Sequence, residues 1–432
     1  MSPELLRIPH GPTEMCDSSH DLLSWMKGQF DRFGSIYRAS VYGTNVYVVS
    51  DPQYVDHILR INWQNYAKGQ AIKRIGLLLG NGLMVSEGEF WKSQRRMVQP
   101  AFHNQAVDAL INVIAGANLA LLQKWSQAAE EKKTVNITSD ISRMVLKVVL
   151  ISIFGDDYEQ IAPHFNILSE DPARNLKFAQ VFRPLGKLVV DIAVQRRNRA
   201  IMANDVLGTL MAARNRTNDQ PMTDSQLVKE IMTLIVAGHE TTASTLNWVW
   251  YLLSTNSEVE QTLWSELDTL PDGAFPGIYD LSRFVYTRQV IEEALRLYPP
   301  GWLMTRKALK EDRLGDFIVP PGTELYICPY LIQRSPDYWQ APDSFDPDRF
   351  GPLESCGRHP MTMLPFSAGP RKCIGESLAR IEMQIHLMTV AKHLRLRCAE
   401  GQPIELEAGV NLRSKYDFIM SPEIIHRNSG AN

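Results

Sequence analysis

The sequence predicts a mainly helical protein with a smaller β portion. Apolar residues recur with helical spacing over several long stretches, and the longest of these runs from Thr223 to about Ser254. Short β-rich runs bounded by turn residues occur near 36–49, 317–328 and 404–419. The helical stretches are much the longer, so we expect the strands to form only a small part of the fold.

The composition is that of an ordinary globular protein. The 432 residues are 44% hydrophobic and 22% charged, with a net charge of -3. Because nucleic-acid binding needs a clustered basic surface, we expect no nucleic-acid partner. No repeat, low-complexity tract or linker divides the chain, so we expect a single domain over residues 1–432.

The cysteines indicate a reducing compartment. They are odd in number, widely spaced and without a Cys-x-x-Cys pair, which argues against a disulfide or zinc framework. They are Cys16, Cys328, Cys356, Cys373 and Cys398. The first residues contain neither a signal-peptide core nor a membrane-spanning run, so we expect no membrane anchor and a cytoplasmic location.

Local signals predict the elements of the first hundred residues. They are a helix over 22–33, strands over 36–41 and 46–49, a helix over 52–59, a long loop over 66–88 and a helix that includes residue 91. Gly43-Thr44-Asn45 marks the hairpin turn, Asp51-Pro52 opens the second helix, and repeated glycines indicate the loop. Trp91 and Arg95, four residues apart, offer two donors that suit a carboxylate, although a stacked Arg–Trp pair fits the same spacing.

The middle of the chain is predicted to be helical. We expect helices over 141–154 and 188–216 with a short connection, and then the long helix, which Thr223 and Gln226 open as a capping box. Within it Gly238 should weaken the helix. The Thr241 hydroxyl can bond the carbonyl of Ala237 or turn towards a ligand. An incidental glycine in a helix with one polar face explains the same residues.

The last third alternates helices and short strands. Ser257 with Glu260 opens one helix, and another over 281–297 ends before Pro299-Pro300. On the second helix Glu293 and Arg296 are three residues apart and can pair. Strands are expected over 317–319 and 324–328.

Cys373 has the surroundings of a metal ligand. Gly369 and Gly375 allow a tight turn, Arg371 and Lys372 precede the sulfur, and a helix follows it. Cations and backbone N–H groups near a thiol favour the thiolate, which is the form that binds metal. A buried structural cysteine in a glycine-rich turn is the alternative.

The segment from Phe366 to Gly375 resembles the haem-binding loop of the cytochromes P-450, Phe-x-x-Gly-x-Arg-x-Cys-x-Gly. Four further motifs resemble that family in the same order: Trp-x-x-x-Arg at 91–95, Ala-Gly-x-Glu-Thr at 237–241, Glu-x-x-Arg at 293–296 and the arginine at 349. The resemblance implies a cytochrome P-450 fold that holds haem b between the long central helix and the cysteine loop.

The resemblance also implies a role for each matching residue. Cys373 would bind the iron, and Thr241, Glu240 and Gly238 would form the catalytic group. The residues implied to contact the cofactor are Trp91, Arg95, Ala237, Arg306, Phe366, Gly369, Arg371 and Gly375. Glu293, Arg296 and Arg349 would form a buried ion-pair network. Gln333 stands where the family often has histidine, so we expect no cofactor contact there.

The implied reaction is monooxygenation of a largely apolar substrate by O2. No dinucleotide fingerprint or stretch for a reductase is present, so a ferredoxin or flavodoxin with an NAD(P)H-dependent reductase is implied. Charges expected to dock it are Lys92, Arg96, Arg371 and Lys372. A peroxide-using enzyme, an isomerase or dehydratase, and a non-enzymatic haem-binding protein are the alternatives, and the Glu240–Thr241 pair argues against the first two.

A largely apolar pocket is expected above the haem. Its predicted lining is Leu77, Leu78, Leu79, Leu83, Leu234, Ala237, Trp302, Leu303, Met304 and Phe418. The family places two roofing helices in the region that is short here, 155–187. We therefore expect a wide mouth, or a mouth closed by a partner such as a carrier domain that presents the substrate.

Overall fold

A computed structural model describes residues 7–165, 177–201, 203–271, 277 and 281–425. Its helices are α1 (Leu22–Phe33), α2 (Pro52–Asp56), α3 (Gln70–Leu79), α4 (Gly88–Val98), α5 (Asn104–Asp108), α6 (Ile111–Glu130), α7 (Ile137–Phe154), α8 (Tyr158–Ile161), α10 (Lys177–Asn198), α11 (Val206–Ala212), α12 (Asp224–Thr255), α13 (Ser257–Leu267), α15 (Val285–Leu297), α16 (Pro329–Ile332) and α17 (Glu376–His386). The mainly helical prediction is confirmed.

The strands form four small sheets. They are β1 (Ile36–Val41), β2 (Thr44–Val49), β3 (Tyr66–Lys68), β4 (Val135–Asn136), β5 (Met304–Ala308), β6 (Asp312–Leu314), β7 (Phe317–Val319), β8 (Glu324–Ile327), β9 (Leu394–Cys398), β10 (Leu406–Ala408), β11 (Leu412–Ser414) and β12 (Ile419–Ile424). The largest sheet has the order β1-β2-β8-β5-β3 and lies with α1 and α2 at the end of the molecule near the N-terminus. The others pair β4-β12-β9, β10-β11 and β6-β7.

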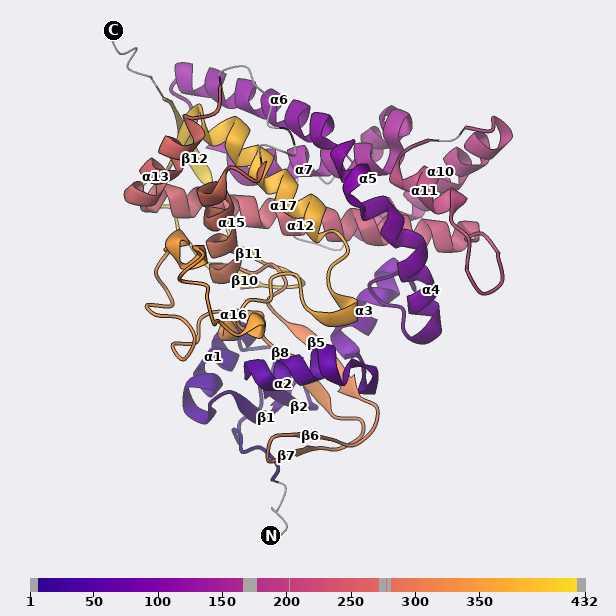
Figure 1. Cartoon of the computed structure of the whole chain (residues 1–432), viewed down its shortest axis with the longest axis vertical. Helices are drawn as coiled ribbons and strands as arrows, with labels where there is room; N and C mark the ends of the chain where they lie inside the picture. Colours follow the sequence, from indigo (N-terminus) through magenta and orange to yellow (C-terminus); the bar gives the residue numbers. More distant parts are fainter. Residues whose placement is uncertain (1–6, 166–176, 202, 272–276, 278–280, 426–432) are drawn as a thin grey trace.

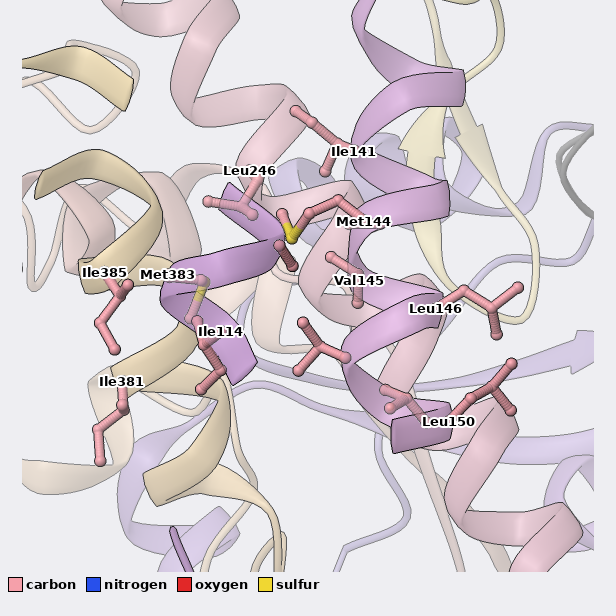
Figure 2. Close-up of a cluster of buried hydrophobic side chains, with 14 of the residues drawn as sticks. Ile114, Ile141, Met144, Val145, Leu146, Leu150, Leu246, Ile381, Met383 and Ile385 are labelled. Carbon is pink, nitrogen blue, oxygen red and sulfur yellow. The ribbon is translucent and has the colours of Figure 1, made fainter. Parts of the chain in front are cut away.

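The helix α12 is the centre of the helical part (Figure 1). Its 32 residues begin at the predicted capping box, in which the Thr223 and Gln226 side chains each bond the other's backbone. Most of the helix is buried, and its largest set of neighbours is α7. Figure 2 shows part of the resulting core, where Ile114 of α6, Met144 of α7, Leu246 of α12 and Met383 of α17 gather.

Several predicted boundaries are wrong. The turn of the first hairpin is Tyr42-Gly43, both with positive φ, so Thr44 and Asn45 belong to the strand. The predicted loop over 66–88 contains β3 and α3, because Gly69 and Gly80 bound that helix and do not break it. Leu281 lies outside α15, whose first N–H groups at Tyr286 and Thr287 bond the carboxylate of Glu266.

The predicted helix over 188–216 is divided in two. The helix α10 ends at Asn198, and Asp205 caps the start of α11 through the N–H of Gly208. The break is fixed by Arg196, which is 3% exposed and binds both Asp157 and Asp205. The prediction of a wide mouth depends on the connection over 155–187, and its middle part, residues 166–176, lies outside the described residues.

One described segment, Asn104–Glu130, is long and apolar enough to cross a membrane by length and composition, with 33% of its most apolar window buried. Its helix α6 contacts α7, α17 and β12. Because a core helix passes the same test of length and composition, the segment is weak evidence for a membrane span.

A buried ion pair ties α15 to the segment before the cysteine loop. The Glu293 carboxylate accepts two bonds from Arg296, at 2.6 and 2.7 Å, and one from Arg349 at 3.2 Å. Arg296 also donates to the backbone oxygens of Gln333, Pro342 and Ser344, so all its donor groups are used. Neither Glu293 nor Arg296 has any exposed surface.

Gln333 extends this network and has no place at the cofactor. It is fully buried, its amide donates to the last carbonyls of α15, Leu295 and Arg296, and its oxygen accepts the N–H of Leu364. Leu364 lies two residues before Phe366. The network therefore positions the start of the cysteine loop from the C-terminus of α15.

Glu293→Gln should destabilise the fold strongly, because it leaves the buried Arg296 without its counter-charge and Arg349 with only Asp346, 3.7 Å away. We expect a loss of about 3–5 kcal/mol in the free energy of unfolding, measured by urea denaturation. Glu405→Gln is the matched control, since Glu405 pairs with Lys415 at the surface, where both are 50% exposed, and should cost less than about 1 kcal/mol. Equal losses in the two variants would contradict a special role for the buried pair.

The buried His386 should make stability depend on pH. Its Nε2 accepts from the indole N–H of Trp250 at 2.8 Å and its Nδ1 bonds the Asn118 oxygen at 2.6 Å, so the neutral ring fits this site. Burial lowers the pKa of His386 to about 3. The unfolded chain takes up a proton near pH 6.5 and the folded one does not, so stability should fall as the pH falls below about 6.5, by up to roughly 1.4 kcal/mol per pH unit. Urea unfolding of His386→Asn between pH 5 and 6.5 should show a smaller slope, and an unchanged slope would contradict this account.

Candidate functional site

The cysteine loop is a tight turn that packs against the residues that follow α2, at Leu59. The Cys373 N–H donates to the Phe366 carbonyl at 2.9 Å, and Gly369 begins a single 3-10 turn with φ of 69°. A Cβ at Gly369 would lie 2.0 Å from the Leu59 carbonyl oxygen. Only glycine fits there, for both its conformation and its space.

The Cys373 thiol faces two opposing influences. Burial by the surrounding protein raises its pKa, and the N–H of Gly375 and the charges of Arg95 and Lys372 act in the other direction. Burial prevails, so the expectation that the surroundings alone favour the thiolate is wrong. A metal that takes the sulfur as ligand displaces the thiol proton.

Cys373 has room for a ligand partner. It is exposed, as is Cys356, whereas Cys16 and Cys328 are buried and burial raises the pKa of Cys328 to about 12. Within the described ranges, no group of three or more His, Cys, Asp or Glu residues could hold a metal ion. The single sulfur of Cys373 suits a metal that brings its other ligands with it, as the iron of a haem does.

A group of buried cations lies beside the loop. Lys68 and Arg306 stand directly opposite each other on β3 and β5, and each is 7% exposed. Burial lowers the pKa of Lys68 to about 7 and that of Arg306 to about 10. Arg371 adds a third positive charge nearby, and Glu87 is the acid that it binds. Like charges in directly opposite positions destabilise a sheet, so this place favours a further anion.

The helix α4 presents its predicted pair to the same place. Trp91 is 5% exposed and packs on Trp63, and the Arg371 guanidinium lies 5.5 Å from the centre of the Trp91 ring. Arg95 donates to the carbonyl of Lys372, next to the cysteine, at 2.8 Å. The structure thus brings Trp91, Arg95, Arg306 and Arg371 to one region. The three arginines and Lys68 are four partly or fully buried cations, which suit the two carboxylates of haem b.

Lys68 is the residue that the sequence did not predict. Its ammonium donates to the carbonyls of Leu83 and Ser86, and the Leu83 N–H donates to Glu230 on α12. The pairing of β3 with β5 places Lys68 opposite Arg306. No local sequence pattern predicts that register. Glu230 is 1% exposed, and burial raises its pKa to about 7.

The middle of α12 is its open part. Ala237, Gly238, Glu240 and Thr241 are part-exposed in a helix that is otherwise largely buried. The helix is not opened at Gly238, contrary to the prediction. A Cβ there would lie 3.3 Å from the Val149 side chain, so the glycine serves the close packing of α12 on α7. The Thr241 hydroxyl bonds the Ala237 carbonyl at 2.8 Å, one of its two predicted positions.

The neighbours of Thr241 differ in their contacts. Glu240 accepts from Arg413 at 3.0 Å and from Asn411 at 2.9 Å, both on the C-terminal hairpin. His239 lies 2.9 Å from the Ser142 hydroxyl oxygen and is 2% exposed, so it is a hydrogen-bonded core residue. Burial lowers the pKa of His239 to about 4.

Some residues predicted to line the pocket lie elsewhere. Phe418 is fully buried, stacks on Tyr251 and meets the edge of Trp248. Trp302 is 3% exposed in the core near the large sheet, with its N–H on the Gly409 carbonyl. Leu77 is 90% exposed. Apolar character alone did not separate core, pocket and surface positions.

Comparisons with known proteins agree with this site. The model of the family "Cytochrome P450" matches residues 13–185 and 160–420. A cyclooctat-9-en-7-ol 5-monooxygenase of Streptomyces melanosporofaciens is 31% identical over 389 residues, which cover 85% of this chain and 84% of that protein. A pentalenene oxygenase of Streptomyces avermitilis is 27% identical over 394 residues, with 86% and 87% covered.

A plant relative and a solved structure extend the comparison. The carotene epsilon-monooxygenase of Arabidopsis thaliana is 28% identical over 444 residues, covering 92% of this chain and 80% of that protein. The structure of retinoic acid bound cyanobacterial CYP120A1 superimposes with a TM-score of 0.85 at 24% identity and covers 97% of this chain and 100% of that one. Haem b is the cofactor of this fold, and the buried cations and Cys373 fit it. The chain belongs to the cytochrome P-450 family and is a haem monooxygenase.

Proposed function

We propose that this monooxygenase inserts one oxygen atom of O2 into a C–H or C=C bond of a largely apolar substrate. The observation that carries the proposal is the group of part-exposed residues in the middle of α12, Ala237, Gly238, Glu240 and Thr241, in a fold that also presents the Cys373 loop. When bound, thiolate-ligated haem supplies the oxygen-activating chemistry. The protein supplies position, a dry pocket and protons.

The residues around the cofactor divide into three tasks. Cys373 would bind the iron, while Phe366, Gly369 and Gly375 shape the loop that presents it. Lys68, Trp91, Arg95, Arg306 and Arg371 would hold the two carboxylates. Ala237 has a small side chain in the open stretch, so α12 can approach the flat cofactor closely there, and Gly238 lets α12 pack closely on α7 behind it.

Thr241 and Glu240 would deliver protons. A hydroxyl bonded to a carbonyl one turn away can change rotamer and point into the pocket, without any change of the helix. Glu240 is the carboxylate next to it in sequence, and the Arg413 and Asn411 bonds fix its present position. A proton on Glu240 could pass to Thr241 directly or through one water.

The substrate class is proposed from the relatives' names. Cyclooctat-9-en-7-ol, pentalenene and carotene are all unsaturated carbon skeletons by their names. Apart from Trp302 and Phe418, which lie elsewhere, the buried residues of the predicted lining are Leu79, Leu83 and Leu234, and they offer such a skeleton apolar contact. A spin-state titration of the holoprotein against cyclic unsaturated hydrocarbons, fatty acids and carrier-bound acids tests this class; a response to the acids alone would contradict it.

The electron donor is proposed to be a separate ferredoxin or flavodoxin, with its NAD(P)H-dependent reductase, in the cytoplasm. Arg96 and Lys372 are exposed, and Lys92 pairs with Glu89 at the surface. Arg371 does not belong with them, because its side chain is 11% exposed and binds Glu87. NAD(P)H and O2 consumption that depend on both substrate and surrogate partners separate this function from a peroxide-using enzyme, an isomerase and a haem-binding protein.

Cys373→Ser should abolish thiolate ligation. The reduced carbon monoxide complex of the wild-type protein should show the red-shifted absorption of a thiolate-ligated haem, and the variant should lose it. Cys356→Ser is the control, since Cys356 is also exposed but lies outside the loop. A native-type band in the Cys373 variant would overturn the assignment of the ligand.

Thr241→Ala should separate electron consumption from product formation. The change removes the hydroxyl but no group that holds the cofactor, so haem content should stay constant. With the proton supply impaired, we expect more H2O2 and less product for each NAD(P)H consumed, by about tenfold or more. Thr242→Ala is the control, because Thr242 is 3% exposed and buried among the helices. Equal coupling of Thr241→Ala and the wild type would assign proton delivery to another group.

A further inference from the structure

An ion pair joins α15 to α17 just after the cysteine loop. The helix α17 begins at Glu376, three residues after Cys373, and packs against α15 (Figure 1). Its Arg380 pairs with Glu292 of α15 and also donates to Glu376, one turn earlier, at 3.1 Å. The neighbouring Glu293 holds the segment before the loop. Two adjacent carboxylates of α15 therefore hold the two ends of the loop.

The pair is only partly screened by water. The side chains of Arg380 and Glu292 are 29% and 13% exposed. Burial lowers the pKa of Arg380 to about 10, and the nearby charge of Arg288 acts in the same direction. The arginine stays charged at neutral pH, and its charge acts over a longer distance than that of a surface side chain.

The same arginine lies against the loop itself. Its guanidinium lies 4.8 Å from the centre of the Phe366 ring, and the Phe366 carbonyl accepts the Cys373 N–H at 2.9 Å. A cation over an aromatic ring is attracted by the negative charge of the ring face. Arg380 therefore contacts the residue whose backbone positions the proposed ligand of the iron.

The charges of this group act on the sulfur. Burial raises the pKa of Cys373 and the Gly375 N–H lowers it, and the Glu376 carboxylate, the next influence in size, raises it. Glu376 in turn binds both Arg380 and Lys372, so two cations offset its charge. A fixed charge that acts on the sulfur also acts on an electron that is added to a metal bound to it.

We propose that Arg380, held in place by Glu292, is a positioning residue that raises the reduction potential of the iron bound by Cys373. The positive charge stabilises the reduced form, which carries one more electron, and Glu292 opposes this effect. The electron comes from the redox partner, and no bond forms or breaks. This inference rests on the proposed ligation of the iron by Cys373, and it adds the residue that determines how readily the iron accepts its first electron.

Two substitutions that change the charge in opposite directions test the inference. Arg380→Gln removes the positive charge, and Glu292→Gln removes the opposing negative charge but keeps an acceptor for Arg380. Arg380→Lys keeps the charge and loses the planar guanidinium. Arg397→Gln is the matched control, because Arg397 binds Glu260 with similar exposure, 33% and 10%, on β9 beyond the far end of α17.

The readout is the midpoint potential of the substrate-free holoprotein, measured by titration with dithionite and redox mediators and without any partner protein. At a fixed potential, Arg380→Gln should lower the ratio of reduced to oxidised protein about three- to tenfold, because a partly buried charge is lost. Glu292→Gln should raise that ratio. Arg380→Lys should restore most of the wild-type ratio, and Arg397→Gln should leave it unchanged.

The sign of the two shifts separates a charge effect from a structural one. A lower ratio in both Arg380→Gln and Glu292→Gln would show that the pair acts only through the shape of the loop, and would overturn the inference. An unchanged potential in Arg380→Gln, with weaker binding of a surrogate ferredoxin, would assign the arginine to partner docking. Should Arg380→Gln fail to fold, Glu292→Gln decides alone: a rise supports the charge effect, and no rise contradicts it.

The carbon monoxide spectrum separates this inference from the ligation on which it rests. Each variant should keep the red-shifted absorption of a thiolate-ligated haem, so that its potential is compared with that of the wild type on the same ligand. If Cys373→Ser keeps a native-type band, the ligation by Cys373 fails and this inference fails with it. If that band is lost in Cys373→Ser while Arg380→Gln leaves the potential unchanged, only the role of Arg380 is overturned.

Discussion

The buried positive charge beside the cysteine loop is the constraint on which this structure depends. Lys68, Arg306 and Arg371 are brought together by β3, β5 and the loop, and Glu87 supplies one opposing charge. Each charge removed from water costs several kcal/mol unless it is paired. An anionic cofactor at this place would pair with these cations and offset the cost of their burial. We therefore expect the charge on the cofactor to hold the sheet, α4 and the loop together.

Lys68 also connects this group of cations to the long helix α12. Lys68 holds the carbonyls of Leu83 and Ser86, and Glu230 of α12 holds the Leu83 N–H. Gly82 packs against α12, where a Cβ would lie 2.3 Å from the Thr233 hydroxyl. The loop between α3 and α4 is thus attached both to the buried cations and to α12. A shift of the cations should therefore move α12, and a shift of α12 should move the cations.

The sequence predicted the parts of the site that a local pattern encodes. The capping box of α12, the Glu293–Arg296 spacing and the glycine turn at Cys373 each lie within ten residues, and short spacings constrain backbone geometry directly. Lys68, Asn411 and Arg413 act through strand register and long-range packing, which no short pattern records. Trp302 and Phe418 were misplaced for the same reason, because a pocket and a core both select apolar side chains.

The continuity of α12 determines which part of the site can move. A Cβ at Gly238 would lie 3.3 Å from the Val149 side chain, so the glycine favours a closed, tightly packed helix. The bonds that remain free to change are those of side chains: the Thr241 hydroxyl on Ala237 and the Glu240 carboxylate on Arg413. A rotamer change costs far less than breaking a buried helix, since no backbone group loses its partner. We therefore expect the proton delivery proposed for Glu240 and Thr241 to depend on these two neighbouring side chains, which would exchange partners while the backbone stays rigid.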